Sequence, residues 1–187
     1  LFKAGDLHPE PDKRSYYLAQ AAYHEAVSLY HYALVLDEEK AVQLLFKALW
    51  CLDIASREFA LTPYTDDFKG IIWMKLDELI SRSQVAHRVL TKIGEVLSLI
   101  HKAELLKKTA DGLHGSSGLK NAADKYKEAS KLYREASHLC EALSELTGLE
   151  GYCRGMVEYC SGIFKLCRGR IEEASSKLLI CCNILRE

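Results

Sequence analysis

A motif of small and aromatic residues occurs twice in this chain, 103 positions apart. It reads A-x3-Y-x-E-A-x2-L-Y-x2-A-x2-L and begins at Ala19 and again at Ala122. Its apolar positions recur at steps of three and four, which places them on one face of a helix. Alanines between larger Tyr and Leu side chains allow a neighbouring helix to approach closely. The repeat therefore predicts a scaffold of packed helices that binds a partner, and it does not suggest catalysis.

The composition narrows the classes of partner. Of the 187 residues 49% are hydrophobic, which is enough for a core, and the formal net charge is −1. A chain without a positive field is not expected to bind nucleic acid or anionic lipid. No run of residues approaches the roughly 18 apolar residues of a membrane span, so direct membrane insertion is not expected either. Because the chain begins at Leu1, we interpret it as a domain of a longer protein that could carry a catalytic domain elsewhere.

The helical pattern predicts an all-α fold of about six helices in two three-helix, bundle-like modules. We expect an extended segment over residues 1–12, a first module over 13–90 and a second over 91–187. A long helical run that begins near Phe68 is expected either to break between about His87 and Gly94 or to form a helix that bridges the two modules. Residues 112–118 are predicted to form a flexible loop, either native or a short linker in place of a deleted loop.

The seven cysteines are an odd number and lie mostly in helical pattern, which is typical of reduced thiols in the cytoplasm or nucleus. Three C-x-G units recur every seven residues, and we predict that they form a tightly packed helix seam. A thiol ladder for metal or redox chemistry is the alternative, but heptad neighbours lie about 10 Å apart, too far for one ion. The seam candidates are Cys153, Gly155, Cys160, Gly162, Cys167 and Gly169.

The patterns of catalytic and metal sites are weak or absent in the sequence. Glu135 and His138 have the E-x2-H spacing of di-iron bundles, but no second such pair exists. There is no phosphate-binding glycine loop, dinucleotide fingerprint or nucleophile elbow. We therefore expect neither a metal nor another cofactor. Trp50 and Trp73 are predicted to anchor the core, with a position beside a groove as the alternative.

Three segments of the first half carry a family pattern. Residues 26–37 hold small residues and a Tyr ahead of an acidic joint, residues 40–49 continue as an Ala- and Leu-rich helix, and residues 78–84 follow as a third. This order resembles the microtubule-interacting and trafficking (MIT) domain, with Ser81 and Ser83 departing from it. Residues 124–133 are similar, so the chain resembles a tandem pair of MIT modules, as in the C-terminal domain of autophagy-initiating kinases. Tetratricopeptide units share the alanine–tyrosine spacing and stay open as an alternative, although their W-x2-L-G signature is absent.

The MIT resemblance implies a non-catalytic, cytoplasmic interaction domain with a groove between helices. Such a groove would take a short amphipathic helix or disordered segment of a partner, in membrane trafficking or autophagy signalling. The groove candidates are Leu45, Leu49, Lys75, Leu76, Leu79 and Arg82. One alternative is a self-associating scaffold that dimerises through the cysteine–glycine seam. The other is a small all-α enzyme or metal protein.

Overall fold

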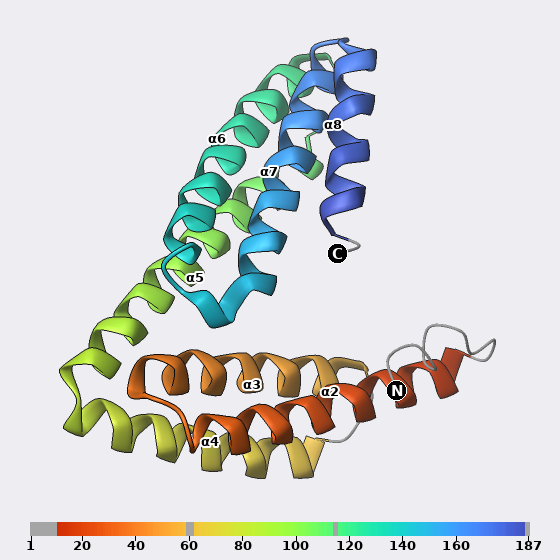
Figure 1. Ribbon diagram of the computed structural model, residues 1–187. Coiled ribbons are helices and arrows are strands. Elements are labelled where there is room, and N and C mark those ends of the chain that lie inside the picture. Colours follow the sequence, from red (N-terminus) through yellow and green to blue (C-terminus); the bar gives the residue numbers. More distant parts are fainter. Residues whose placement is uncertain (1–10, 59–61, 114–115, 186–187) are drawn as a thin grey trace. The chain divides into compact units, whose positions relative to one another are not determined.

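The computed structural model describes residues 11–58, 62–113 and 116–185, and every regular element in them is a helix (Figure 1). The predicted all-α class is therefore confirmed, although this described part holds seven α-helices and one short 3-10 helix, where about six helices were expected. The chain divides into two compact units, Leu1–Leu90 (unit 1) and Thr91–Glu187 (unit 2). The elements are α2 (Pro11–Ala33), α3 (Glu38–Glu58), α4 (Thr62–Arg82), α5 (Gln84–Asp111), α6 (Ser116–Cys140), η1 (Ser144–Leu146), α7 (Thr147–Cys167) and α8 (Ile171–Ile184).

In unit 1, α2 and α3 lie side by side and are joined by a tight turn (Figure 1). Asp37 caps α3, because its side chain accepts a hydrogen bond from the backbone N–H of Lys40 at 3.0 Å. Glu38 and Glu39 follow in the first turn, where carboxylates interact favourably with the helix dipole. The acidic joint predicted from the sequence is therefore confirmed.

The first copy of the repeated motif forms the contact surface of α2. Ala19 and Ala22 are fully buried and cluster with Ala55 of α3, so the two backbones approach closely there. The motif's tyrosines contact α4, since the rings of Tyr23 and Tyr30 lie 6.1 and 5.4 Å from that of Phe68. Small residues thus pack α2 against α3, and aromatic rings pack it against α4.

The long helical run breaks before the predicted region, and its second part, α5, is the alternative that was expected, a helix that continues across the boundary between Leu90 and Thr91. The break lies at Ser83, between α4 and α5, while the predicted region between His87 and Gly94 is continuous helix. The Ser83 hydroxyl accepts a hydrogen bond from the backbone N–H of Ala86 at 3.3 Å, which caps the N-terminus of α5. The same hydroxyl donates to the carboxylate of Glu38 at the start of α3. Ser83 therefore ends one helix, starts the next and ties both to α3.

In unit 2 the second copy of the motif lies in α6. Its buried residues share one apolar cluster with α5 and α7, and burial of this area is the main driving force for packing the three helices. The fully buried members of the cluster include Ala103 of α5, Ala129 and Tyr133 of α6, and Cys160 of α7.

Helix α8 packs against α7 at two glycines (Figure 1). A Cβ atom on Gly155 would lie 2.6 Å from Leu185 Cδ2, and one on Gly162 would lie 2.9 Å from Leu178 Cγ. At Gly155 the contact is with the side chain of Leu185, which is 49% exposed and can shift, whereas at Gly162 the backbone carbonyl of Ala174 also lies 3.3 Å from the added Cβ, so Gly162 is the more restrictive position. Gly169 has another role: with φ of 73° it ends α7, and the backbone N–H groups of Gly169 and Arg170 bond to the carbonyls of Leu166 and Lys165.

Two predicted boundaries are wrong by a few residues. Helix α2 begins at Pro11, so residues 11 and 12 of the expected extended segment are helical, whereas residues 1–10 lie outside the described part. Proline suits the first helical position because its missing N–H would have no intrahelical partner there. Helix α6 begins at Ser116, inside the loop expected over 112–118, of which residues 114–115 also lie outside the described part.

Candidate docking surface

The four predicted groove leucines lie in the interior of unit 1. Leu45, Leu49, Leu76 and Leu79 are between 0 and 7% exposed. In this conformation a partner peptide cannot reach them, so they belong to the core and line no accessible groove. The sequence identified the apolar stripes correctly, but it predicted that these leucines line an exposed groove, whereas they are buried.

The two predicted cationic groove residues are exposed or half-buried, but both are already paired. Lys75 Nζ lies 2.8 Å and Arg82 Nη1 lies 2.9 Å from the carboxylate of Glu78. The hydrogen bond from Lys75, together with the charges of both cations, holds the pKa of Glu78 below its usual value. The two cations share this single carboxylate, so each has an acidic neighbour and the pair retains one positive charge in excess.

An aromatic surface is accessible where α3 and α4 meet. Phe46 of α3 contacts Trp73 of α4 edge to face, with ring centroids 6.3 Å apart. Trp73 is 51% exposed, and Trp50, one helical turn after Phe46, is 36% exposed. We call Phe46, Trp50 and Trp73 the tryptophan face. Large aromatic side chains left half-exposed on neighbouring helices are typical of protein interfaces.

Acidic groups predominate around the tryptophan face. Lys69 Nζ lies 2.6 Å from the carboxylate of Asp53 and 3.9 Å from that of Asp66, so two acids share one cation. Asp77 of α4, one helical turn after Trp73, is exposed and forms no ion pair or hydrogen bond with any other described residue. Arg57 of α3 is exposed on the same side as Trp50, and its Nε–H donates to the Asp53 carbonyl at 3.2 Å. The face therefore combines apolar rings with a surplus of negative charge.

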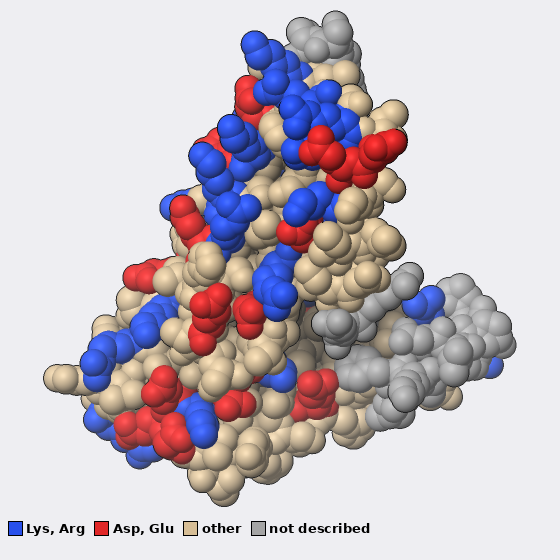
Figure 2. Space-filling model, turned by 45° about the horizontal axis from the view of Figure 1, so that its top comes forward, with Lys and Arg blue, Asp and Glu red and all other residues tan. Residues whose placement is uncertain are grey.

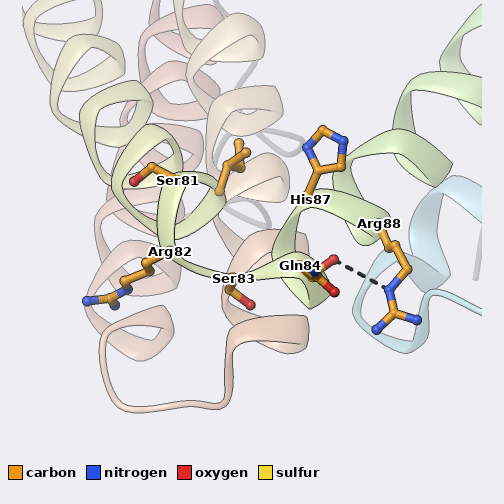
Figure 3. Close-up of a pocket in the computed structure, with 7 residues that line it drawn as sticks. Ser81, Arg82, Ser83, Gln84, His87 and Arg88 are labelled. Atoms are coloured by element: carbon orange, nitrogen blue, oxygen red, sulfur yellow. Dashed lines mark hydrogen bonds between the residues drawn. The ribbon is translucent and has the colours of Figure 1, made fainter.

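An open pocket of about 570 Å³ lies at the α4–α5 joint (Figure 3). Ser83 and Gln84 form its turn, with His87 and Arg88 on the next helical turn. Its polar groups hold the joint together: Ser83 caps α5, and the Arg88 Nε–H donates to the Gln84 carbonyl at 3.4 Å. We regard this pocket as a consequence of the helix break.

The cysteine–glycine repeat divides into three environments. Cys153 and Cys160 are buried, Gly155 and Gly162 contact α8, and the last pair lies outside the seam, with Cys167 half-buried and Gly169 exposed. Burial raises the pKa of the Cys160 thiol to about 12, so this thiol stays protonated and unreactive at neutral pH. Because α8 of the same chain covers the two interior glycines, the seam offers no surface for a second copy.

A polar cluster that the sequence did not reveal joins α5 to α6 and α7. The Glu104 carboxylate accepts hydrogen bonds from the hydroxyls of Tyr133 and Tyr152, the latter at 2.7 Å, and from Lys107 Nζ at 3.3 Å. Burial acts to raise the pKa of Glu104, but the two tyrosines and Lys107 outweigh it and the pKa is lowered. The cluster is internal to unit 2 and stabilises its packing.

The metal-site candidates of the sequence do not assemble. Among the described residues, no three His, Cys, Asp or Glu side chains are grouped so that they could hold an ion. His138 lies instead against Glu141, with Nδ1 3.2 Å from the carboxylate. In the same described part, no helix has the length and hydropathy needed to span a bilayer.

No family model matches the chain, and neither a curated protein nor a solved structure matches it. The resemblance to MIT modules therefore stays a prediction based on the motifs quoted above. The same holds for the tetratricopeptide alternative.

Proposed function

We propose that this chain is a non-catalytic protein-interaction domain whose unit 1 docks a short amphipathic helix of a partner protein on the tryptophan face. The observation that carries the proposal is the pair of half-exposed tryptophans on α3 and α4. Tryptophan is enriched among the residues that dominate binding energy, because it buries a large area at little conformational cost. The tandem three-helix, bundle-like arrangement and a role in membrane trafficking or autophagy signalling stay part of this proposal.

The shape and charge of the face define the partner. The tryptophan face is formed by two neighbouring helices, and a usual partner for an apolar face of this kind is a helix that presents apolar residues at i, i+3 and i+7. Asp53, Asp66 and Asp77 outnumber Lys69 and Arg57 around the face. The partner helix should therefore carry Lys or Arg beside its apolar stripe.

The proposal is tested with a synthetic amphipathic peptide of about 14 residues, the length of an ordinary protein helix. The peptide has leucines at i, i+3 and i+7 and lysines elsewhere, and its binding to the full chain is measured by calorimetry. We expect Trp73→Ala to weaken binding by about tenfold or more, the usual effect of removing an interface tryptophan.

Tyr64→Ala is the matched control, because Tyr64 is also an exposed aromatic residue of α4, at 70% exposure, but projects from another side of that helix. It should bind like the wild type. Equal binding by the Trp73 variant and the wild type, with both folded by circular dichroism, would exclude the tryptophan face as the site.

A further inference from the structure

A row of cations on α6 has no internal partner. Lys120, Lys127, Lys131 and Arg134 follow one another at steps of seven, four and three, so they lie on one side of the helix. All four are exposed, and none forms an ion pair or hydrogen bond with another described residue. Figure 2 shows basic side chains, with acidic ones among them, on the visible face of unit 2. We call these four residues the basic stripe.

Four acidic residues near the basic stripe are paired with other side chains, whereas Glu128 and Glu135, exposed on the adjoining edge of α6, are not, so two unpaired acids face four unpaired cations among the described residues. Asp124 lies 3.7 Å from Arg168, and Glu141 lies 3.2 Å from His138. On α7 the pattern is the same: the carboxylate of Glu150 lies 3.7 Å from Arg154, and that of Glu158 lies 2.8 Å from Lys177. The positive charge of the stripe is therefore a surplus, although the chain as a whole has a net charge of −1.

The C-terminal end of the stripe borders a groove. An open cavity of about 470 Å³ lies between α6 and α8, with Arg134 on the α6 side and Ile180 and Ile184 on the α8 side. Val157 of α7 contributes to its lining as well. Ile180 is 41% exposed, so the α8 wall of the groove is apolar and accessible, whereas the α6 wall carries Arg134 beside Ser137 and His138. The rest of the lining is charged and mixed in sign, with Glu141, Glu150, Arg154 and Glu158.

We propose that this groove and the basic stripe bind an acidic, amphipathic segment of a partner protein. Its carboxylates would pair with Lys127, Lys131 and Arg134, and its apolar side chains would contact Ile180 and Ile184. The surface lies on unit 2 and is basic, so it is separate from the acidic tryptophan face of unit 1 and would take a segment of opposite charge.

A narrow acidic chain fits this surface better than an anionic membrane does. Glu128 and Glu135 are exposed on the outer edge of the same helix, next to the stripe. A flat anionic bilayer that contacted the stripe would also contact these carboxylates, which it would repel. A single polypeptide can follow the stripe and the groove without meeting them.

The test uses a synthetic peptide with leucines at i, i+3 and i+7 and glutamates elsewhere, titrated into the full chain. We expect binding that weakens as salt is raised, and a loss of about tenfold or more in the double variant Lys131→Glu/Arg134→Glu. Lys125→Glu is the control, because Lys125 lies on the opposite side of α6. It makes the same kind of charge change on the same helix and should leave affinity within about twofold of the wild type.

A second variant tests the apolar half of the site. Ile180→Ala removes exposed apolar surface and should weaken binding several-fold without changing the salt dependence. Equal binding by the double charge variant and the wild type, with retained helical content, would overturn the proposal. It would also be overturned if vesicles containing phosphatidylserine bound through Lys131 and Arg134 while the peptide did not bind.

Discussion

The two copies of the repeated motif, in α2 and α6, bury their alanines equally but give their tyrosines different partners. Ala26 and Ala129 are both fully buried. Tyr30 is half-buried and packs on the Phe68 ring of α4, whereas its counterpart Tyr133 is fully buried and donates a hydrogen bond to Glu104 of α5. The motif thus specifies a helix with a close-packed seam, and the next helix decides how the tyrosine is used.

The difference follows from what each neighbouring helix offers. Helix α4 presents Phe68, so the tyrosines of α2 make ring contacts with it. Helix α5 presents Glu104 and Asp111, which accept hydrogen bonds from Tyr133 and Tyr126. Burial and these carboxylates raise the pKa of both tyrosines. The tyrosines of α6 therefore remain neutral donors throughout the physiological range.

The largest expected effect on the free energy of unfolding comes from the buried alanines that both copies of the motif share. Ala26→Leu and Ala129→Leu each insert a large side chain between closely packed helices, and each should destabilise its own unit by about 1–3 kcal/mol or more. Trp50 and Trp73 both lie in unit 1, so tryptophan fluorescence follows that unit during urea unfolding, and hydrogen exchange follows unit 2. If only one of the two substitutions lowers the stability of its unit, the two copies of the motif are not structurally equivalent.

The tyrosine contacts should separate the copies. Tyr133→Phe removes one of the hydrogen bonds to Glu104 and should destabilise unit 2 by about 1–2 kcal/mol, since bonds to charged groups are stronger than neutral ones and Glu104 is partly exposed. Tyr30→Phe should change unit 1 by less than about 0.5 kcal/mol. If fluorescence and hydrogen exchange show equal destabilisation by the two substitutions, the hydrogen bond from Tyr133 to Glu104 does not contribute measurably to the stability of unit 2.

The contact between α8 and Gly162 can be tested by comparing two glycines of α7, one that contacts α8 and one that does not. Gly162→Ala forces Leu178 to move and should destabilise unit 2 by about 1 kcal/mol, despite the better helix propensity of alanine. Gly151→Ala, also in α7, meets no atom within 4 Å and should stabilise the helix by up to about 1 kcal/mol. If both substitutions stabilise unit 2, α8 does not pack closely against Gly162.

The smallest expected effect is a pH dependence confined to unit 2. Because the folded-state pKa of Glu104 lies below its usual value of 4.5, ionised Glu104 favours folding above about pH 4.5, and this contribution is lost as the pH falls through the lowered pKa. Glu104→Gln should therefore flatten the acid limb of unit 2, measured by hydrogen exchange between pH 6 and 3, roughly the range of carboxyl titration. If the variant loses stability on acidification as steeply as the wild type, carboxylates other than Glu104 cause the pH dependence of unit 2.

The sequence predicted those features of the fold that local pattern controls. The helical class, the joint at Asp37 and the burial of Cys153 and Cys160 all follow from periodicity and capping. The break at Ser83 did not, because it depends on a hydrogen bond to Glu38, 45 residues earlier in the chain.

The candidate site was predicted less well than the fold. Periodicity shows that Leu76 and Trp73 are both apolar residues of one helix, but it does not show which of them the neighbouring helices cover. The same limit applies to the charges, since Lys75 and Lys131 look alike until the structure shows that only Lys75 has a carboxylate beside it. Exposure and charge compensation are properties of packing between elements.

The most direct test of the account compares the lysine-rich and glutamate-rich amphipathic peptides on the same protein. Both tryptophans of the chain belong to the tryptophan face, so their emission reports occupancy of that face alone. We predict that the lysine peptide shifts the emission to shorter wavelength, whereas the glutamate peptide binds in calorimetry and leaves the emission unchanged. An emission shift caused by the glutamate peptide, or by neither peptide, would contradict the assignment of docking surfaces to the two units.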